Sequence, residues 1–223
     1  MSGELRHALV MAAGRGARMM PLTSVIPKPM APYLGSTLIA NGIRQIRKFV
    51  SHIHITVGYK GAMLAEHVIT EGVDSVFNTS ERGNAWWVYN TLMAQLNEPV
   101  LVLTSDNVVE LEFDRISEEY HRLGAPACMV VPVTPVPGLD GDYIYLDGDV
   151  VTKLDRHHPS DRYCSGIQVI NPAKVVAMTT RCDDFMELWG QLIAQRELKS
   201  SRIYVSRWFT VDTLEQLQLL NAQ

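Results

Sequence analysis

Residues 8–29 read ALVMAAGRGARMMPLTSVIPKP. The first six residues are an apolar run that ends at Gly14, as expected of a strand buried on both faces. Gly14 and Gly16 let the backbone turn sharply and approach a ligand without interference from a Cβ atom. Successive backbone amides in such a turn can hold phosphate oxygens. Arg18 and Lys28 add positive charge, so the stretch predicts a strand followed by a phosphate-binding turn.

Short β-type runs alternate with amphipathic stretches on the C-terminal side of this turn. We predict strands at residues 8–13, 52–57, 75–77, 99–104 and 127–134, and helices at 38–49, 61–70, 84–96 and 113–123. An alternating β–α order predicts a mostly parallel sheet with crossover helices.

The second half of the chain is richer in strands. We predict strands at 142–146, 149–154, 163–170 and 202–205, with Asp147-Gly148 as a hairpin turn, and helices at 172–180, at 183–195 and from about Thr213. No linker divides the chain. We therefore predict one Rossmann-like α/β domain over residues 1–223, with a mixed, mostly parallel central sheet flanked by helices and a β-rich second half.

Composition narrows the class of protein. The 223 residues are 47% hydrophobic and carry 20 Lys and Arg against 24 Asp and Glu, a net charge of −4. The apolar content excludes a disordered chain, and the acidity argues against a nucleic-acid partner. Three scattered cysteines suggest neither disulfides nor a zinc site. With no signal peptide or apolar run of membrane-spanning length, we expect a cytoplasmic protein without a membrane partner.

The glycine-rich turn differs from two common phosphate loops. No GxxxxGK[ST] string occurs, and Met19 stands where a dinucleotide fingerprint needs its third glycine. The string G-x-G-x-R-[LM]-x-P-L-T-x-x-x-P-K-P over residues 14–29 instead resembles the signature of nucleotidyltransferases that make sugar nucleotides and related activated alcohols. Every fixed position of that signature is matched.

This resemblance implies roles for particular residues. The loop with Ala12, Ala13, Gly14 and Gly16 would wrap a nucleoside triphosphate (NTP), with Arg18 and Lys28 as the catalytic cations on its phosphates. Asp106 and Asp212 match the family's Mg²⁺-binding carboxylates. The position of Asp106 at the end of a central strand independently favours a ligand-facing carboxylate. Thr210 departs from the acidic residue usual in the family's W-x-[DE]-[IV]-[DG]-T box. Asp212-Thr213 has capping of the last helix as an alternative role.

Residues 81–89, ERGNAWWVY, bear on the substrate. They resemble the E-R-G-N-G-x-S-L box of inositol-1-phosphate cytidylyltransferases and, more distantly, a box of phosphocholine cytidylyltransferases. Gly83 and Asn84 would then contact the nucleotide, and Trp86 and Trp87 would bind a cationic head group of the acceptor. Adjacent helical residues point in different directions, so one tryptophan has a core position as its alternative. The match to the L-G-T-A-G-A box of sugar-1-phosphate enzymes is partial.

The acceptor side is indicated by two further segments. Lys153 or Arg156 would contact the acceptor phosphate, and Ser165 with Gly166 resembles a strand that lines the acceptor pocket. The resemblance predicts a Mg²⁺-dependent enzyme that transfers a nucleoside monophosphate, CMP favoured, from an NTP (CTP favoured) to a small phosphorylated or phosphonate acceptor. Residues of about 7–135 would bind the NTP and about 136–223 the acceptor. A sugar-1-phosphate guanylyl- or uridylyltransferase and a catalytically silent nucleotide-binding subunit are the alternatives, and a homodimer stays open.

Overall fold

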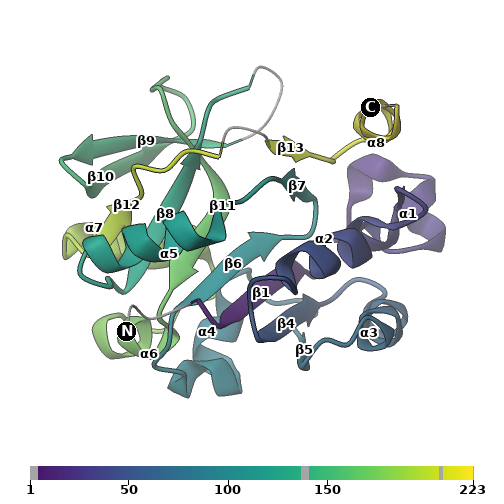
Figure 1. Ribbon diagram of the computed structural model, residues 1–223, viewed down its shortest axis with the longest axis horizontal. Helices are drawn as coiled ribbons and strands as arrows, with labels where there is room; N and C mark the ends of the chain where they lie inside the picture. Colours follow the sequence, from purple (N-terminus) through teal and green to yellow (C-terminus); the bar gives the residue numbers. More distant parts are fainter. Residues whose placement is uncertain (1–4, 137–140, 206–207, 223) are drawn as a thin grey trace.

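A computed structural model describes residues 5–136, 141–205 and 208–222, and a nine-stranded sheet runs through its centre (Figure 1). The order of strands across the sheet is β5-β4-β1-β6-β11-β8-β12-β10-β9. Their bounds are β1 His7–Ala12, β4 His52–Val57, β5 Ser75–Asn78, β6 Val100–Thr104, β8 Cys128–Val133, β9 Asp142–Asp147, β10 Val150–Asp155, β11 Tyr163–Ile170 and β12 Leu198–Ser200.

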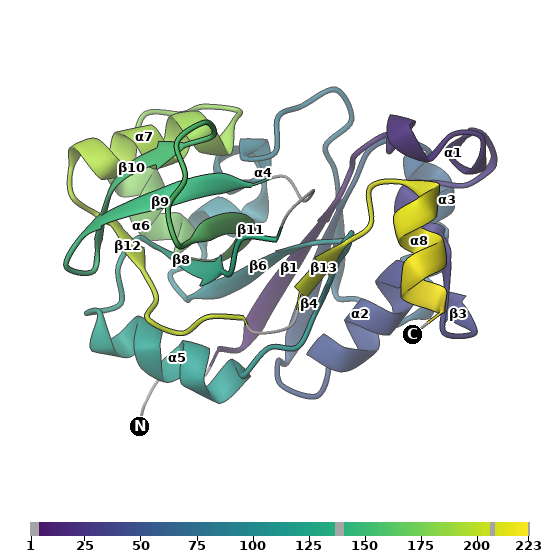
Figure 2. The same cartoon turned by 90° about the horizontal axis from the view of Figure 1, so that it is seen from above.

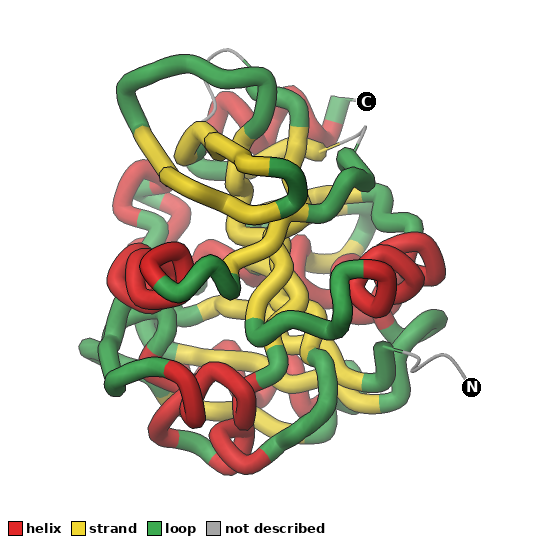
Figure 3. Tube along the Cα trace, turned by 90° about the vertical axis from the view of Figure 1, so that its left-hand side faces the viewer, coloured by secondary structure: helices red, strands yellow, loops and turns green. Residues whose placement is uncertain are grey.

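The two halves of the sheet differ in strand direction. Strands β5, β4, β1 and β6 are parallel neighbours, as expected for apolar runs joined by crossover helices. Strand β11 runs antiparallel to β6, β8 and β9, and β9 and β10 form a hairpin. In the tube view the strands lie in the middle with helices on either side (Figure 3). The predicted mixed α/β fold is confirmed.

Helices cover both faces of the sheet (Figure 2). On one face, α2 (Leu38–Ile46), α3 (Gly61–Thr70) and α5 (Phe113–Arg122) contribute buried residues such as Ile43, Leu64 and Ile116 to one apolar cluster. On the other, α4 (Trp86–Asn90), α6 (Pro172–Met178) and α7 (Phe185–Ala194) contribute Trp87 and Leu188 to a second. The described helices include none long and apolar enough to cross a bilayer.

Smaller elements complete the edge at which the parallel strands end. Two three-residue strands, β7 (Asn107–Val109) and β13 (Trp208–Thr210), pair antiparallel. The remaining elements are η1 (Ala17–Met19), α1 (Leu22–Val25), η2 (Lys28–Met30), β2 (Pro32–Tyr33), β3 (Ser36–Thr37), η3 (Leu92–Gln95) and α8 (Leu214–Asn221). A third apolar cluster, which includes Met19 and Leu217, packs α8 beside the glycine-rich turn. The C-terminal segment is thereby held next to the end of β6.

Two predicted elements were wrong in their bounds. The helix predicted at 84–96 is interrupted at Thr91, whose backbone is extended (φ −121°, ψ 176°). Its hydroxyl donates to Trp87 O and accepts from Met93 N, and such local bonds compete with the helical ladder. The strand predicted at 202–205 lies instead at β12. Ser201 Oγ accepts from Ile203 N in a turn there, and Val205 forms an isolated bridge with Val133.

Candidate active site

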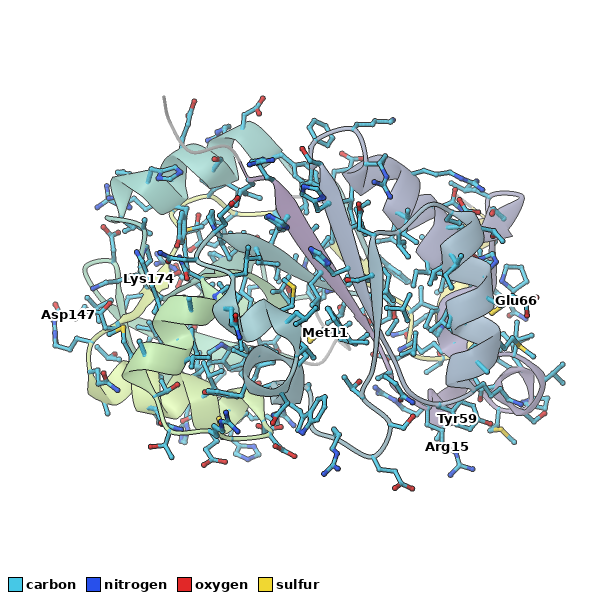
Figure 4. The ribbon with its side chains drawn as sticks, turned by 90° about the horizontal axis from the view of Figure 1, so that it is seen from below. Met11, Arg15, Tyr59, Glu66, Asp147 and Lys174 are labelled. Carbon is cyan, nitrogen blue, oxygen red and sulfur yellow. The ribbon has the colours of Figure 1, made fainter. Side chains whose placement is uncertain are left out.

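The glycine-rich turn is fastened to the body of the protein by hydrogen bonds. Gly16 has a left-handed conformation (φ 62°), and its carbonyl accepts a 3.0 Å hydrogen bond from Thr23 Oγ1. The Tyr59 hydroxyl donates to Thr23 O at 2.9 Å. The Arg15 guanidinium lies 5.5 Å from the centre of the Tyr59 ring, and the two side chains are labelled next to each other in Figure 4. The turn is therefore held in one shape before any ligand arrives.

Lys28 occupies the centre of the site. A Cβ added to Gly16 would lie 2.7 Å from Lys28 Cβ, so the glycine is what lets the lysine stem pass. Lys28 Nζ donates to Asp106 Oδ2 and to Asp212 Oδ1, both at 2.7 Å. The lysine side chain is only 10% exposed. Its ammonium thus bridges two carboxylates from distant parts of the sequence.

Arg18 adds a second cation to this group. Arg18 Nη2 lies 3.1 Å from Asp212 Oδ1, and its side chain is 60% exposed. Two cations and two carboxylates therefore converge from the glycine-rich turn, the end of β6 and the C-terminal segment. These are the four residues to which the sequence assigned the catalytic and metal-binding roles, and the fold brings them together.

Asp212 reaches the site through the small β7–β13 pair. Val211 N donates to Asp106 O at 3.0 Å, directly after the paired strands. The cap of α8 is Thr213, whose side chain accepts from Gln216 N, rather than Asp212. The predicted cap at Asp212-Thr213 is therefore confirmed for Thr213, which leaves the Asp212 carboxylate available to the site. That carboxylate turns toward Lys28.

A cavity of about 510 Å³ opens over these groups; we call it the glycine-loop pocket. Its walls come from the glycine-rich turn, the ends of the parallel strands and the segment before α4. They include Met11, Ala13, Gly14, Gly16, Ala17, Arg18, Lys28, Pro29, Thr56, Thr79, Glu81, Arg82, Gly83, Asn84, Trp87, Thr104, Ser105, Asp106 and Asp212. Ala12 is buried in β1, where its N–H donates to Thr56 Oγ1, so it supports the wall without lining it.

A second cavity of about 340 Å³ adjoins the first; we call it the Arg156 pocket. It is lined by Asn84, Thr104, Asp106, Asn107, Gly141, Asp142, Arg156, Cys164, Ser165, Gly166, Asp184, Phe185, Met186, Trp189, Trp208 and Thr210. Asn84, Thr104 and Asp106 line both cavities. The two pockets therefore meet at the carboxylate that Lys28 holds, which is the arrangement that joining two ligands requires.

The predicted acceptor residues are divided by the fold. Arg156, Ser165 and Gly166 line the Arg156 pocket, where Arg156 Nε lies 3.1 Å from Asp142 Oδ1. Lys153 is largely exposed and pairs with Asp155 on β10, and it is not part of either pocket wall. Of the two sequence candidates for contact with an acceptor phosphate, Arg156 lines one of the two pockets and Lys153 lines neither.

The tryptophan pair also separates. Trp87 is 1% exposed, packs edge-on against Phe185 and reaches the wall of the glycine-loop pocket. Trp86 lines neither pocket. The Arg82 guanidinium lies over the Trp86 ring, 5.6 Å from the ring centre. Neither indole faces the Arg156 pocket. Trp87 is therefore the tryptophan with the core position, and a head-group site formed by both rings stays a prediction.

Sequence reasoning missed several walls of the Arg156 pocket. Asp142, Asp184, Phe185, Trp189 and Trp208 come from three separate segments, and no motif links them. Trp208 alone carried a signal, since it begins the C-terminal motif. The same pocket contains the Cys164 thiol, and burial raises the pKa of that thiol to about 12. It stays protonated at neutral pH and is no nucleophile.

The chemistry of the central group suits a divalent cation. The described residues contain no cluster of three or more His, Cys, Asp or Glu arranged to hold a metal. Mg²⁺, however, is commonly held by one or two carboxylates together with water and substrate phosphates. Asp106 and Asp212 both lie 2.7 Å from one ammonium, so their oxygens already surround a single positive charge. The pair therefore fits Mg²⁺ that arrives with a phosphate ligand.

The sequence matches known proteins over most of its length. A family model described as nucleotidyl transferase matches residues 7–138. The mannose-1-phosphate guanylyltransferase catalytic subunit beta of Drosophila melanogaster is 22% identical to this chain over 88% of it and 57% of its own length. The chain thus spans somewhat more than half of that curated relative.

Two solved structures share the fold. The inositol-1-phosphate CTP transferase from T. maritima superimposes with a TM-score of 0.80 at 16% identity, over 100% of this chain and 97% of that one. The CTP:phosphocholine cytidylyltransferase from Streptococcus pneumoniae gives 0.75 at 19% identity, over 97% of each chain. At these identities the likeness is one of fold.

Proposed function

Because this chain belongs to the nucleotidyl transferase family, we propose that it transfers a nucleoside monophosphate from an NTP to a small phosphorylated or phosphonate acceptor. One observation carries the proposal. The ammonium of Lys28 lies between Asp106 and Asp212 where two cavities meet. An acceptor oxygen would attack the α-phosphorus, a new P–O bond would form, and the bond to the bridging oxygen would break to release pyrophosphate.

Such a transfer depends on positioning and on neutralising charge rather than on covalent chemistry by the protein. In our proposal Gly14 and Gly16 present backbone amides to the NTP phosphates. Arg18 binds the β- and γ-phosphates, and Lys28 stabilises charge that develops on the transferred phosphoryl group. The exposure of Arg18 and the burial of Lys28 support this division. An exposed outer cation suits the leaving pyrophosphate, whereas a buried inner one suits the reacting centre.

Asp106 and Asp212 would hold Mg²⁺ in the loaded enzyme. When bound, the ion would supply positive charge that neutralises the substrate phosphates. Lys28, which bridges the two carboxylates in the structure, would contact phosphate when substrate is bound. The lysine therefore exchanges one set of anionic partners for another as substrate binds.

The Arg156 pocket is the proposed acceptor site. Arg156 supplies a cation for the acceptor phosphate, and Ser165 and Gly166 form the wall beside it. We assign about residues 7–135 to NTP binding and about 136–223 to the acceptor. Asp212 is the exception, since it comes from the second half and lines the glycine-loop pocket.

CTP is our first candidate for the donor. Residues 81–84 resemble the box of inositol-1-phosphate cytidylyltransferases, and Glu81, Arg82, Gly83 and Asn84 all line the glycine-loop pocket. GTP with a sugar 1-phosphate is the second candidate, because the curated relative with 22% identity is a mannose-1-phosphate guanylyltransferase.

The test is an assay of pyrophosphate release. Each of the four NTPs with Mg²⁺ is combined with phosphocholine, aminoethylphosphonate, inositol phosphate, and hexose or heptose 1-phosphates. We expect release with CTP and one acceptor. Release with GTP or UTP and sugar phosphates alone would replace the first donor candidate by the second. Nucleotide binding without turnover on any acceptor would favour a silent binding subunit.

A further inference from the structure

A pair of backbone segments joins the walls of the two pockets. Ala85 N donates to Asp183 O at 2.9 Å, and Phe185 N donates to Asn84 Oδ1 at 2.8 Å. Gly83 permits this close approach, because an added Cβ would lie 2.0 Å from Asp183 O. We call residues 83–85 and 183–185, with these two hydrogen bonds, the clasp.

The clasp fixes how the Asn84 side chain is used. A backbone N–H must donate to an oxygen, so Oδ1 is the atom bound to Phe185 N and Nδ2 is the atom that points elsewhere. Asn84 is an exposed residue that lines both the glycine-loop pocket and the Arg156 pocket. One end of its amide therefore anchors α7, while the other is a donor at the boundary between the pockets.

Each half of the clasp continues directly into a pocket wall. Arg82 and Gly83 line the glycine-loop pocket on one side. Asp184, Phe185 and Met186 line the Arg156 pocket on the other, and they form the start of α7.

Packing behind the clasp makes the connection stiff. Asp184 Oδ1 caps the helix by accepting from Met186 N at 2.7 Å. The Trp87 and Phe185 rings meet edge-on with their centres 6.4 Å apart. A displacement of residues 83–85 is therefore passed to the first turn of α7 rather than absorbed by a loose loop.

We propose that the clasp couples the two pockets, with Asn84 as a positioning residue. A nucleotide in the glycine-loop pocket orders residues 83–85, and through Asn84 Oδ1 it orders the first turn of α7 in the Arg156 pocket. By linkage, an acceptor that orders α7 strengthens nucleotide binding by the same factor. This inference rests on the proposed function in one respect, namely that the glycine-loop pocket binds the nucleotide.

Hydrogen exchange of the full chain tests the coupling without requiring the acceptor. Peptides that cover residues 183–189 are followed with and without Mg·CTP and, separately, Mg·GTP. The chain is wild type, Asn84→Ala, Asn84→Asp or the control Asn90→Ala. Asn90 is the matched control because it is an asparagine at the end of α4 that lines neither pocket. Its Nδ2 donates to Trp86 O within the same helix. Nucleotide affinity is measured by calorimetry first, so that each variant is examined at saturation.

We expect nucleotide to slow exchange at 183–189 by about 3- to 10-fold in the wild type, the range that one net hydrogen bond provides. Asn84→Ala should lose this effect, and Asn84→Asp should keep it because its carboxylate still accepts from Phe185 N. Asn90→Ala should behave as the wild type does.

Nucleotide binding with unchanged exchange at 183–189 would overturn the coupling and leave the proposed function standing. Equal slowing in wild type and Asn84→Ala would overturn the role of Asn84. Absence of nucleotide binding to the wild type would overturn the proposed function, and the coupling with it.

Discussion

Replacing Lys28 with methionine removes the positive charge at the centre of the site and keeps most of the length of the unbranched side chain. The Lys28 ammonium lies 2.7 Å from one oxygen of each of Asp106 and Asp212. If it also stabilises the transferred phosphoryl group, its loss should resemble the loss of one oxyanion donor, about 3–4 kcal/mol of the barrier. Turnover should therefore fall by about 10²–10³-fold.

The same substitution has a separate effect on stability. The side chains of Asp106 and Asp212 are 25% and 16% exposed, so their ion pairs with Lys28 are intermediate between surface pairs and fully buried pairs. Surface pairs contribute about 0–1 kcal/mol, and breaking a buried pair costs about 3–5 kcal/mol. We expect Lys28→Met to lower the free energy of unfolding by about 2 kcal/mol. Arg18 remains 3.1 Å from Asp212, so Asp106 should account for most of this loss.

Urea unfolding and pyrophosphate release, measured on the same variants, separate the two effects. Adding Asp106→Asn to Lys28→Met removes the unneutralised carboxylate, so stability should recover while turnover does not. Lys48→Met, at an exposed position, is the matched control and should change neither quantity. Turnover of Lys28→Met within threefold of wild type would refute the catalytic assignment. A double variant no more stable than Lys28→Met would refute the electrostatic account.

Three further substitutions give independent tests. Gly16→Ala should cut turnover at least tenfold in the pyrophosphate assay, because the added Cβ would lie 2.7 Å from Lys28 Cβ at a residue with a left-handed φ. Circular dichroism should show little change in secondary structure. Trp87→Ala should lower the free energy of unfolding in urea by about 3–5 kcal/mol, and a loss under 1 kcal/mol would contradict its core position. Burial of the ring, and to a smaller extent the charge of His7, lower the pKa of His54 to about 4 in the folded protein. As the pH falls, the unfolded chain therefore becomes protonated at His54 before the folded protein does. Stability should be complete above about pH 6.5 and fall toward pH 4. In urea titrations, the free energy of unfolding of His54→Gln should fall by about 1–2 kcal/mol less than that of the wild type over this pH range, a figure reduced for the partial exposure of the ring. Identical pH profiles of the two proteins would exclude His54 as the source of the fall.

Some of the site could be predicted because its signals are local. The glycine-rich turn and Lys28 lie within one continuous motif, and Asp106 directly follows an apolar run. Buried parallel strands need apolar segments, so β1 and β6 were recognisable from their apolar runs, and β4 from its alternating pattern. The convergence of Lys28 with both aspartates then follows from their positions at one edge of the sheet.

Other parts could not be predicted because they depend on packing between distant segments. Lys153 and Arg156 are both cationic and three positions apart, but of the two only Arg156 lines the Arg156 pocket. Trp86 and Trp87 are adjacent and chemically identical, and packing against distant segments, α7 among them, decides which one is buried. Strands of three residues, such as β7 and β13, are too short for the alternation by which strands are recognised.

The β7–β13 pair has a consequence for when the acidic pair of the site is assembled during protein synthesis. Lys28 and Asp212 are 184 positions apart, so the second carboxylate joins the first only after a long segment of chain has closed on itself. Domains fold from their N-terminal side as the ribosome delivers them, and the parallel strands precede Asp212 by more than a hundred residues. A nascent chain that stops short of residue 212 carries the glycine-rich turn without its complete acidic pair. The group formed by Lys28, Asp106 and Asp212 is thereby completed only after translation has passed that residue.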